Sequence, residues 1–371
     1  MILSYSSKKG EEKIVKDTTP VILPHKLKLH KNYLIKGENL NILKTLYQEG
    51  YKEKIDLIYI DPPFATNQTF RKGTTRAATI SSCLDDEIAY IDDKVGEEFI
   101  EFIRERLIML KKLMSSRGSI YLHIDYKIGH YVKIMMDEVF GIKNFRNDIA
   151  RIKCNPKNFK RKGYGNVKDL ILFYTKNYDF IWNEPLVDRA NEEIIKLFKK
   201  IDSKGRRYTT NPLHAPGETR NGQTGQMWKG MLPPKGRHWR YDPKALDELD
   251  KQGLIEWSKT GVPRKIIYAD DFSQKRMQDI WEFKDTQKPE YPTQKNLEML
   301  ELIIKTSSNK ESIIMDCFCG SGTTLVAANQ LGRNWIGIDK SNPAIKVAQK
   351  RLNDLPSSLF SKVEYELLVE G

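Results

Sequence analysis

Residues 97–116 carry the clearest helical pattern of the chain. Apolar side chains recur there at intervals of three and four, the spacing of one face of an α-helix. The stripe consists of Phe99, Phe102, Ile103, Leu107, Leu110 and Leu113. We therefore predict an amphipathic helix that ends at Gly118.

Short apolar runs alternate with further helical patterns on both sides of this helix. Before the middle of the chain, strands are predicted within 32–36, 54–61 and 118–125, and helices within 38–48 and 129–140. Toward residue 371, a helix is predicted within 292–308, a strand, turn and helix within 312–332, a strand within 334–341 and a helix within 342–354. This alternation predicts an α/β fold with a parallel sheet.

Two stretches lack this alternation. Residues 1–30 are polar and lysine-rich, which predicts an N-terminal arm with little structure of its own. From residue 151 to residue 289, glycine and proline recur without clear periodicity, which predicts an inserted, irregular domain. The sheet domain is then expected in two halves, 31–150 and 290–371.

Composition limits the class of protein. The 371 residues contain no run of about 18 apolar residues and no signal-peptide pattern, so we expect a soluble, cytoplasmic protein. The four cysteines and six histidines have no metal-ligand spacing, so no metal site is predicted. The net charge of +13 favours an acidic partner. Most of that excess, and five of the six tryptophans, lie within 151–289, as in a nucleic-acid-binding segment or a solvated basic face.

Residues 312–324, SIIMDCFCGSGTT, combine a predicted strand, a glycine turn and the start of a helix. Gly320 and Gly322 allow the backbone to approach a ligand, and a helix N-terminus presents free N–H groups. Asp339 ends the next predicted strand, where a carboxylate can accept hydrogen bonds from a ribose diol. The unit suits an adenosine-containing cofactor, or it is a turn that only packs a strand against a helix.

The glycine spacing narrows the choice of cofactor. No lysine follows the glycines, as a P-loop requires, and the third glycine of the dinucleotide pattern is absent. The shorter pattern D-x-F-x-G-x-G, from Asp316 to Gly322, suits S-adenosylmethionine, which has no pyrophosphate to bind. We therefore predict S-adenosylmethionine as the cofactor.

Residues 57–67, LIYIDPPFATN, end a buried strand with an acid, two prolines and an aromatic residue. Ligand chemistry lies at the carboxyl ends of parallel strands, so Asp61 would face the cofactor turn if the two strands are neighbours. Asp61 and the Pro62 carbonyl can accept the two hydrogens of a base amine, with Pro63 stiffening the turn and Phe64 stacking on the base. A base within a duplex must be flipped out to reach such a site. The alternative is an aspartate that only caps a turn.

DPPF at 61–64, YPTQK at 291–295 and DCFCGSGTT at 316–324 together resemble the amino-group DNA methyltransferases of the permuted β class, in which the catalytic motif precedes the cofactor motif. The resemblance covers about 31–150 and 288–371, and the segment between them resembles the target-recognition domain by position alone. It implies a Rossmann-like methyltransferase sheet that acts on double-stranded DNA with S-adenosylmethionine, in a nucleoid-associated protein.

The resemblance also assigns roles to residues. The catalytic residues it implies are Asp61, Pro62, Pro63 and Phe64. The cofactor-binding residues it implies are Asp316, Phe318, Gly320, Gly322, Thr323 and Asp339, together with Thr293, Gln294 and Lys295, which follow Pro292. Thr293 is also expected to cap the next helix. The family often has Asp where this chain has Glu38–Asn39, so no cofactor role is assigned there.

The sequence favours one acceptor of the methyl group, adenine N6, and leaves other acceptors open. The chain has no Pro-Cys pair, which excludes cytosine-C5 chemistry. N4-cytosine members of the family usually have Ser at the position of Asp61, so the resemblance favours site-specific methylation of adenine N6. N4 of cytosine, an RNA acceptor and a catalytically silent DNA-binding module are the alternatives. Family members differ in whether they dimerise and whether a restriction endonuclease accompanies them, so a homodimer and a cognate endonuclease remain open as partners.

Basic residues near the predicted site are expected to contact DNA phosphates. They are Arg71, Lys72 and Arg76 in the polar loop 65–93, and Arg151, Lys153, Lys157, Lys160, Arg161 and Lys162 after it. We predict that this loop orders over the flipped base. Arg220, Asn221, Gln223 and Gln226 offer donors that suit base edges, or they are solvated. His123 and Asp125 end a predicted strand and are expected to form a structural pair; the alternative is that they line the site.

Overall fold

The computed structural model describes residues 2–17, 21, 23–63, 68–71, 88–92, 94, 96–156, 160, 162–285, 291, 294–355 and 363–371, with the backbone alone at 68–71 and 88–92. The chain divides into two compact units. Unit 1 comprises Met1–Pro185 and Gln278–Gly371, and unit 2 comprises Leu186–Met277. Within the described residues, no helix combines the length and apolar character that crossing a membrane requires.

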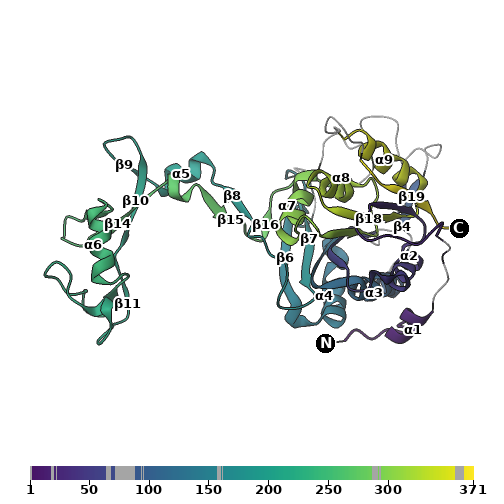
Figure 1. Cartoon of the computed structure of the whole chain (residues 1–371), viewed down its shortest axis with the longest axis horizontal. Coiled ribbons are helices and arrows are strands. Elements are labelled where there is room, and N and C mark those ends of the chain that lie inside the picture. The colour runs from purple at the N-terminus through teal and green to yellow at the C-terminus, as the bar shows by residue number, and fades with distance from the viewer. Residues whose placement is uncertain are drawn as a thin grey trace. The chain divides into compact units, whose positions relative to one another are not determined.

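A nine-stranded sheet forms the centre of the described part of unit 1, in the order β16-β6-β7-β5-β2-β17-β18-β1-β19 (Figure 1). Its strands are β1 (Tyr33–Lys36), β2 (Ile55–Ile60), β5 (Met114–Ile124), β6 (Phe145–Ile152), β7 (Lys168–Thr175), β16 (Ile280–Trp281), β17 (Ile313–Asp316), β18 (Asn334–Asp339) and β19 (Glu366–Val369). Only β7 runs antiparallel to its neighbours among these strands. The predicted α/β class is confirmed.

Helices cover both faces of this sheet (Figure 1). One side carries α2 (Asn39–Leu46), α3 (Gly96–Leu113) and α4 (Tyr126–Phe140), and the other carries α7 (Leu297–Ser307), α8 (Thr323–Gln330) and α9 (Asn342–Asn353). The apolar stripe predicted for residues 97–116 packs into the core, as helical spacing requires. A π-helical turn (Tyr47–Tyr51) follows α2, and β3 (Gln68–Arg71) pairs separately with β4 (Ile88–Asp92).

Strands β2 and β17 are direct neighbours in the sheet. They run parallel, with Leu57 beside Ile314 and Ile58 beside Met315. Their carboxyl ends therefore meet at one edge of the sheet. The adjacency on which the predicted active site depends is confirmed.

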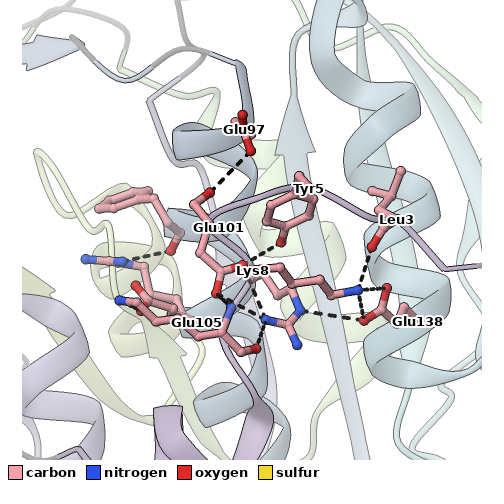
Figure 2. Close-up of polar contacts among 12 residues, drawn as sticks. Leu3, Tyr5, Lys8, Glu97, Glu101, Glu105 and Glu138 are labelled. Carbon is pink, nitrogen blue, oxygen red and sulfur yellow. Dashed lines mark hydrogen bonds and ion pairs between the residues drawn. The ribbon is translucent and has the colours of Figure 1, made fainter.

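Among the described residues of the predicted N-terminal arm, 1–30, regular structure is limited to one short helix, and several side chains of the arm contact helices of the sheet domain. Helix α1 (Glu11–Lys16) buries Ile14, and the preceding residues lie along α3 and α4 (Figure 2). Tyr5 donates a hydrogen bond to Glu101 at 2.5 Å, and Lys8 Nζ lies 2.9 Å from Glu138 Oε2. Basic side chains of the arm thus pair with acidic ones on the helices, which composition alone did not show.

The boundaries of the inserted domain also differ from the prediction of 151–289. Strands β6, β7 and β16 belong to the large sheet, and the second unit spans only Leu186–Met277. Strand β7 is buried and pairs with a strand on each edge. Its apolar sequence was not predicted as a strand, because glycine- and lysine-rich residues directly precede it. The basic segment that begins at Arg151 is therefore partly a continuation of the sheet.

Unit 2 is more regular than predicted. Its strands are β8 (Leu186–Asp188), β9 (Lys200–Ile201), β10 (Arg207–Pro212), β11 (His214–Pro216), β12 (Arg237–Trp239), β13 (Ile255–Trp257), β14 (Pro263–Tyr268) and β15 (Gln274–Arg276), and its α-helices are α5 (Asn191–Leu197) and α6 (Pro243–Lys251). Strands β13-β14-β10-β9 form an antiparallel sheet, and β11–β12 and β8–β15 form ribbons. Such short strands give little periodicity.

A small core holds unit 2 together. Leu213, Trp228, Trp239 and Leu246 are buried against one another. The indole N–H of Trp228 donates to Asp247 at 2.8 Å, and that of Trp239 donates to the Gln226 carbonyl at 3.0 Å. Two of the tryptophans that marked this segment as aromatic-rich are therefore structural.

Candidate active site

Asp316 ends strand β17 and organises the glycine turn. Its Oδ1 accepts the Phe318 N–H at 3.0 Å, and its Oδ2 accepts the Thr324 hydroxyl at 2.5 Å. The side chain is buried, and this burial raises the pKa of Asp316 to about 7. The carboxyl group thus ties the end of the strand to the first turn of α8.

Gly320 and Gly322 adopt the left-handed backbone region, with φ of 49° and 74°. A Cβ atom on Gly322 would lie 2.9 Å from the Ala348 Cβ of α9, so this glycine also permits close helix packing. A Cβ on Gly320 would meet no atom nearer than the Phe318 carbonyl oxygen, at 4.0 Å. The described residues therefore leave space over the turn at Gly320.

Asp339 ends β18 beside this turn. Its Oδ2 accepts the Gly320 N–H at 2.9 Å, and its Oδ1 accepts the Ser341 N–H at 2.8 Å. The residue is partly exposed, and each carboxylate oxygen can accept a further hydrogen bond. The predicted ribose-binding carboxylate thus lies next to the predicted cofactor turn.

Arg351 is a supporting residue that the sequence interpretation missed. From α9 its Nη1 donates to the Ser321 carbonyl and to the Thr323 hydroxyl, both at 2.9 Å. Thr323 therefore contributes its side chain to this support. Phe318 packs against Phe102 of α3 with ring centroids 6.0 Å apart, which fixes the other side of the turn. No sequence motif connects these helices to the turn.

Asp61 follows strand β2 and lies at the same edge of the sheet. Its Oδ2 is 2.8 Å from the Lys295 ammonium. Its Oδ1 is buried and, among the described residues, has no hydrogen-bond partner. Pro62 is buried after it, and Pro63 is partly exposed, whereas Phe64 lies outside the described residues. The site therefore contains a carboxylate with one acceptor that no described residue engages.

The YPTQK segment differs in part from its prediction. Helix α7 is capped by Asn296, whose Oδ1 accepts the Met299 N–H at 3.0 Å, so the prediction of Thr293 as the cap is wrong. Pro292 and Thr293 lie outside the described residues, and Gln294 and Lys295 are partly buried. The ammonium of Lys295, a residue predicted to bind the cofactor, contacts Asp61.

A buried polar chain lies beside Asp61. The Tyr59 hydroxyl is 2.9 Å from His123 Nδ1, and His123 Nε2 is 3.2 Å from Asp169 Oδ2. Burial, reinforced by the charge of Lys295, lowers the pKa of His123. The neutral imidazole then donates to Asp169 and accepts from Tyr59. His123 is thus a satisfied structural residue, but the expected partner, Asp125, instead caps α4 through the Lys127 N–H.

Arg151 is buried, which contradicts its predicted role in phosphate binding. Its Nη2 lies 2.5 Å from Asp285 Oδ1, its Nε donates to the Phe283 carbonyl at 2.7 Å, and its Nη1 lies 3.5 Å from Asp169. Lys153 Nζ also pairs with Asp169, at 2.6 Å. Distant acidic residues of unit 1 therefore neutralise the first cations of the basic segment.

The structure describes only some of the other residues that were predicted to contact DNA. Lys160 and Lys162 are exposed, as are Arg220, Asn221, Gln223 and Gln226 in unit 2. Lys72, Arg76, Lys157 and Arg161 lie outside the described residues, and only the backbone of Arg71 is described. Most of loop 65–93 also lies outside the described residues, so the predicted ordering of this loop over the base stays a prediction. No group of three or more His, Cys, Asp or Glu side chains arranged to hold a metal occurs within the described ranges.

Comparisons with known proteins identify the family of this chain. A family model described as DNA methylase, of the N6 and N4 type, matches residues 55–350. The type II methyltransferase M.EcaI of Enterobacter cloacae is 43% identical over 326 residues, covering 86% of this chain and 69% of that protein. The Mod subunit of the type III restriction-modification enzyme StyLTI of Salmonella typhimurium is 26% identical over 365 residues, covering 88% of this chain and 54% of the subunit.

A solved structure, the M1.HpyAVI–SAM complex, has 20% identity and a TM-score of 0.44, covering 86% of this chain and all of that one. The chain spans about half the length of the type III Mod subunits that it matches.

Proposed function

The chain belongs to the DNA methylase family, and we propose that it is a site-specific enzyme that methylates N6 of adenine in duplex DNA with S-adenosylmethionine. The observation that carries this proposal is the Asp61 carboxylate. It lies at the end of the strand beside the cofactor turn and keeps a buried oxygen without a partner among the described residues. A base amine can supply the missing donor.

The residues around the turn fit S-adenosylmethionine. Gly320 leaves space for a ligand against the backbone, and α8 begins at Gly322 without a side-chain cap in the described structure, so its first N–H groups suit a carboxylate. Asp339 can accept hydrogen bonds from ribose hydroxyls. Asp316 and Phe318 would hold the shape of the turn. When bound, S-adenosylmethionine supplies an electrophilic methyl group.

The chain's own contribution is to prepare the amine. The lone pair of an exocyclic amine is delocalised into the base, so the nitrogen is a poor nucleophile. A hydrogen bond from this amine to Asp61 Oδ1, with a second to the Pro62 carbonyl, favours a tetrahedral nitrogen with a localised lone pair. The negative charge of Asp61 also stabilises positive charge that develops on the nitrogen. The base must leave the duplex stack to reach these acceptors.

Adenine N6 is preferred over cytosine N4 because residue 61 is an aspartate rather than the serine usual in the N4 enzymes that this sequence resembles. A serine hydroxyl is a neutral acceptor, whereas the carboxylate is charged and forms the stronger hydrogen bond.

We further propose that unit 2 recognises the DNA target. Its exposed segment 220–226 carries amide and guanidinium donors, which suit base edges in the major groove. Exposed Lys160 and Lys162 of unit 1 suit phosphates. Because several relatives are named as subunits of restriction-modification enzymes, this chain is proposed to act in such a system, with an endonuclease as its functional counterpart.

Expression in a methylation-free host, followed by single-molecule sequencing of the host genome, tests the proposal. The expected result is N6-methyladenine within one recurrent sequence, and mass spectrometry of a duplex with that sequence should show one added methyl group on adenine. Methylation of cytosine N4 would overturn the choice of base. An unmodified genome from cells that contain folded, S-adenosylmethionine-binding protein would overturn the activity.

A further inference from the structure

Lys295 forms an ion pair with Asp61, and a contact between Lys295 and the cofactor would not explain this pair. We propose that Lys295 is a positioning residue, which holds one oxygen of Asp61 so that the other stays available to the target amine. This inference rests on the proposed function and adds a residue to it.

The geometry separates the two oxygens of Asp61. Lys295 Nζ lies 2.8 Å from Oδ2, and the side chains are only 11% and 17% exposed. A charge-assisted hydrogen bond this short, shielded from water, is stronger than a neutral one and opposes rotation of the carboxylate. Oδ1 is buried with no partner among the described residues, so it is the oxygen left for a ligand.

The lysine is itself held in place by its neighbours along the chain. Asn296 caps α7 and also donates from its Nδ2 to the Lys284 carbonyl at 3.1 Å. Lys295 directly precedes this cap, so α7 fixes its backbone beside the end of β2. The neighbouring His123 is kept neutral and already bonds Tyr59 and Asp169. It therefore adds no second cation next to Asp61.

Two other roles for Lys295 predict different behaviour. If its ammonium occupied the place of the target amine, the base would have to displace it, and removing it would strengthen DNA binding. If it contacted the cofactor, its removal would weaken S-adenosylmethionine binding. A positioning residue acts on the rate of transfer and on neither affinity.

The test compares Lys295→Met, Lys295→Arg and the control Lys305→Met in the full chain. Lys305 lies on α7, the helix that Lys295 precedes, and pairs with Glu301 at an exposed site. The substrate is a duplex carrying the sequence found by genome sequencing. Single-turnover transfer rates, dissociation constants for S-adenosylmethionine and for the duplex, and thermal unfolding are measured for each protein.

We expect Lys295→Met to slow transfer by about 10- to 100-fold, the range typical of residues that orient a reactive group, with both dissociation constants within about twofold of wild type. Lys295→Arg should recover part of the rate, because a guanidinium can also donate to Oδ2, and Lys305→Met should match wild type.

Tighter duplex binding without a loss of rate, weaker S-adenosylmethionine binding with full rate at saturation, or a loss of rate that only follows a loss of thermal stability would each overturn the positioning role. An active wild type with an equally active Lys295→Met variant would also overturn it. If wild type itself transfers no methyl group, the proposed function fails instead.

Discussion

Asp61 and Asp316 stand at the ends of neighbouring strands, but their carboxylates are used differently. Both oxygens of Asp316 accept hydrogen bonds from the turn and from α8. Asp61 has one oxygen on Lys295 and a second that is buried without a partner in the described structure. An unpaired buried acceptor costs about 1–3 kcal/mol. The contacts of Asp316 are structural, and the acceptor of Asp61 that no described residue engages supports the proposal that this carboxylate binds the target amine.

The largest effect is expected from Asp61→Asn, which removes the charge and preserves the shape. Methyl transfer should fall by roughly 10²- to 10³-fold, as when one group that stabilises transition-state charge is removed. Single-turnover kinetics measures the rate, and calorimetry should show unchanged S-adenosylmethionine binding. A variant as active as wild type would contradict the role of Asp61.

Arg151→Met removes a buried guanidinium whose ion pairs are structural. It leaves Asp169 and Asp285 without their guanidinium, so the free energy of unfolding should fall by about 3–5 kcal/mol in urea titrations.

The matched control is Lys162→Met, because Lys162 is exposed. This variant should unfold like wild type and bind duplex DNA more weakly, with a smaller salt dependence. Weak DNA binding by an Arg151→Met protein of normal stability would show that this arginine contacts phosphate after all.

Gly322→Ala is expected to strain the glycine turn that the hydrogen bonds of Asp316 hold. An alanine in the left-handed region costs about 1–2 kcal/mol, and its Cβ would crowd Ala348. Both the melting temperature and the affinity for S-adenosylmethionine should fall. Gly165→Ala is the control, since no described atom lies within 4 Å of its Cβ position. Equal melting curves for the two variants would argue against the strain.

The smallest effect concerns the pH dependence of stability. Burial raises the pKa of Asp316 from 3.8 to about 7. Between these values the folded chain keeps a proton that the unfolded chain releases, so this group's contribution to stability is lost as pH rises through about 7. Asp316→Asn should flatten that decline in thermal melts between pH 5 and pH 8. Parallel curves for both proteins would contradict the raised pKa.

The sequence predicted the parts of the site that reside in contiguous motifs. Strand, glycine turn and helix follow one another from Ile313 to Gln330, and the predicted site depended on β2 lying beside β17, as it does. The adjacency itself was an assumption of the sequence analysis, and the pairing of the strands in the structure confirms it.

What could not be predicted depends on partners that are distant along the chain. Arg151 was interpreted as a surface cation because its neighbours are basic, yet Asp169 and Asp285 neutralise it. Arg351 reaches the cofactor turn from helix α9, with no spacing that links it to the motif. The motif predicted Lys295 as a site residue, but not its contact with Asp61. Strands of two or three residues in unit 2 are too short to give a periodic pattern.

The pairing of β2 with β17 also governs when the site can form during synthesis. Leu57 emerges from the ribosome long before Ile314, its neighbour in the sheet, and the whole of unit 2 is made between them. Such non-local pairing slows folding, because a long loop must close first. A nascent chain therefore carries Asp61 without a pocket beside it, and methylating capacity arises only when the late strands have been translated.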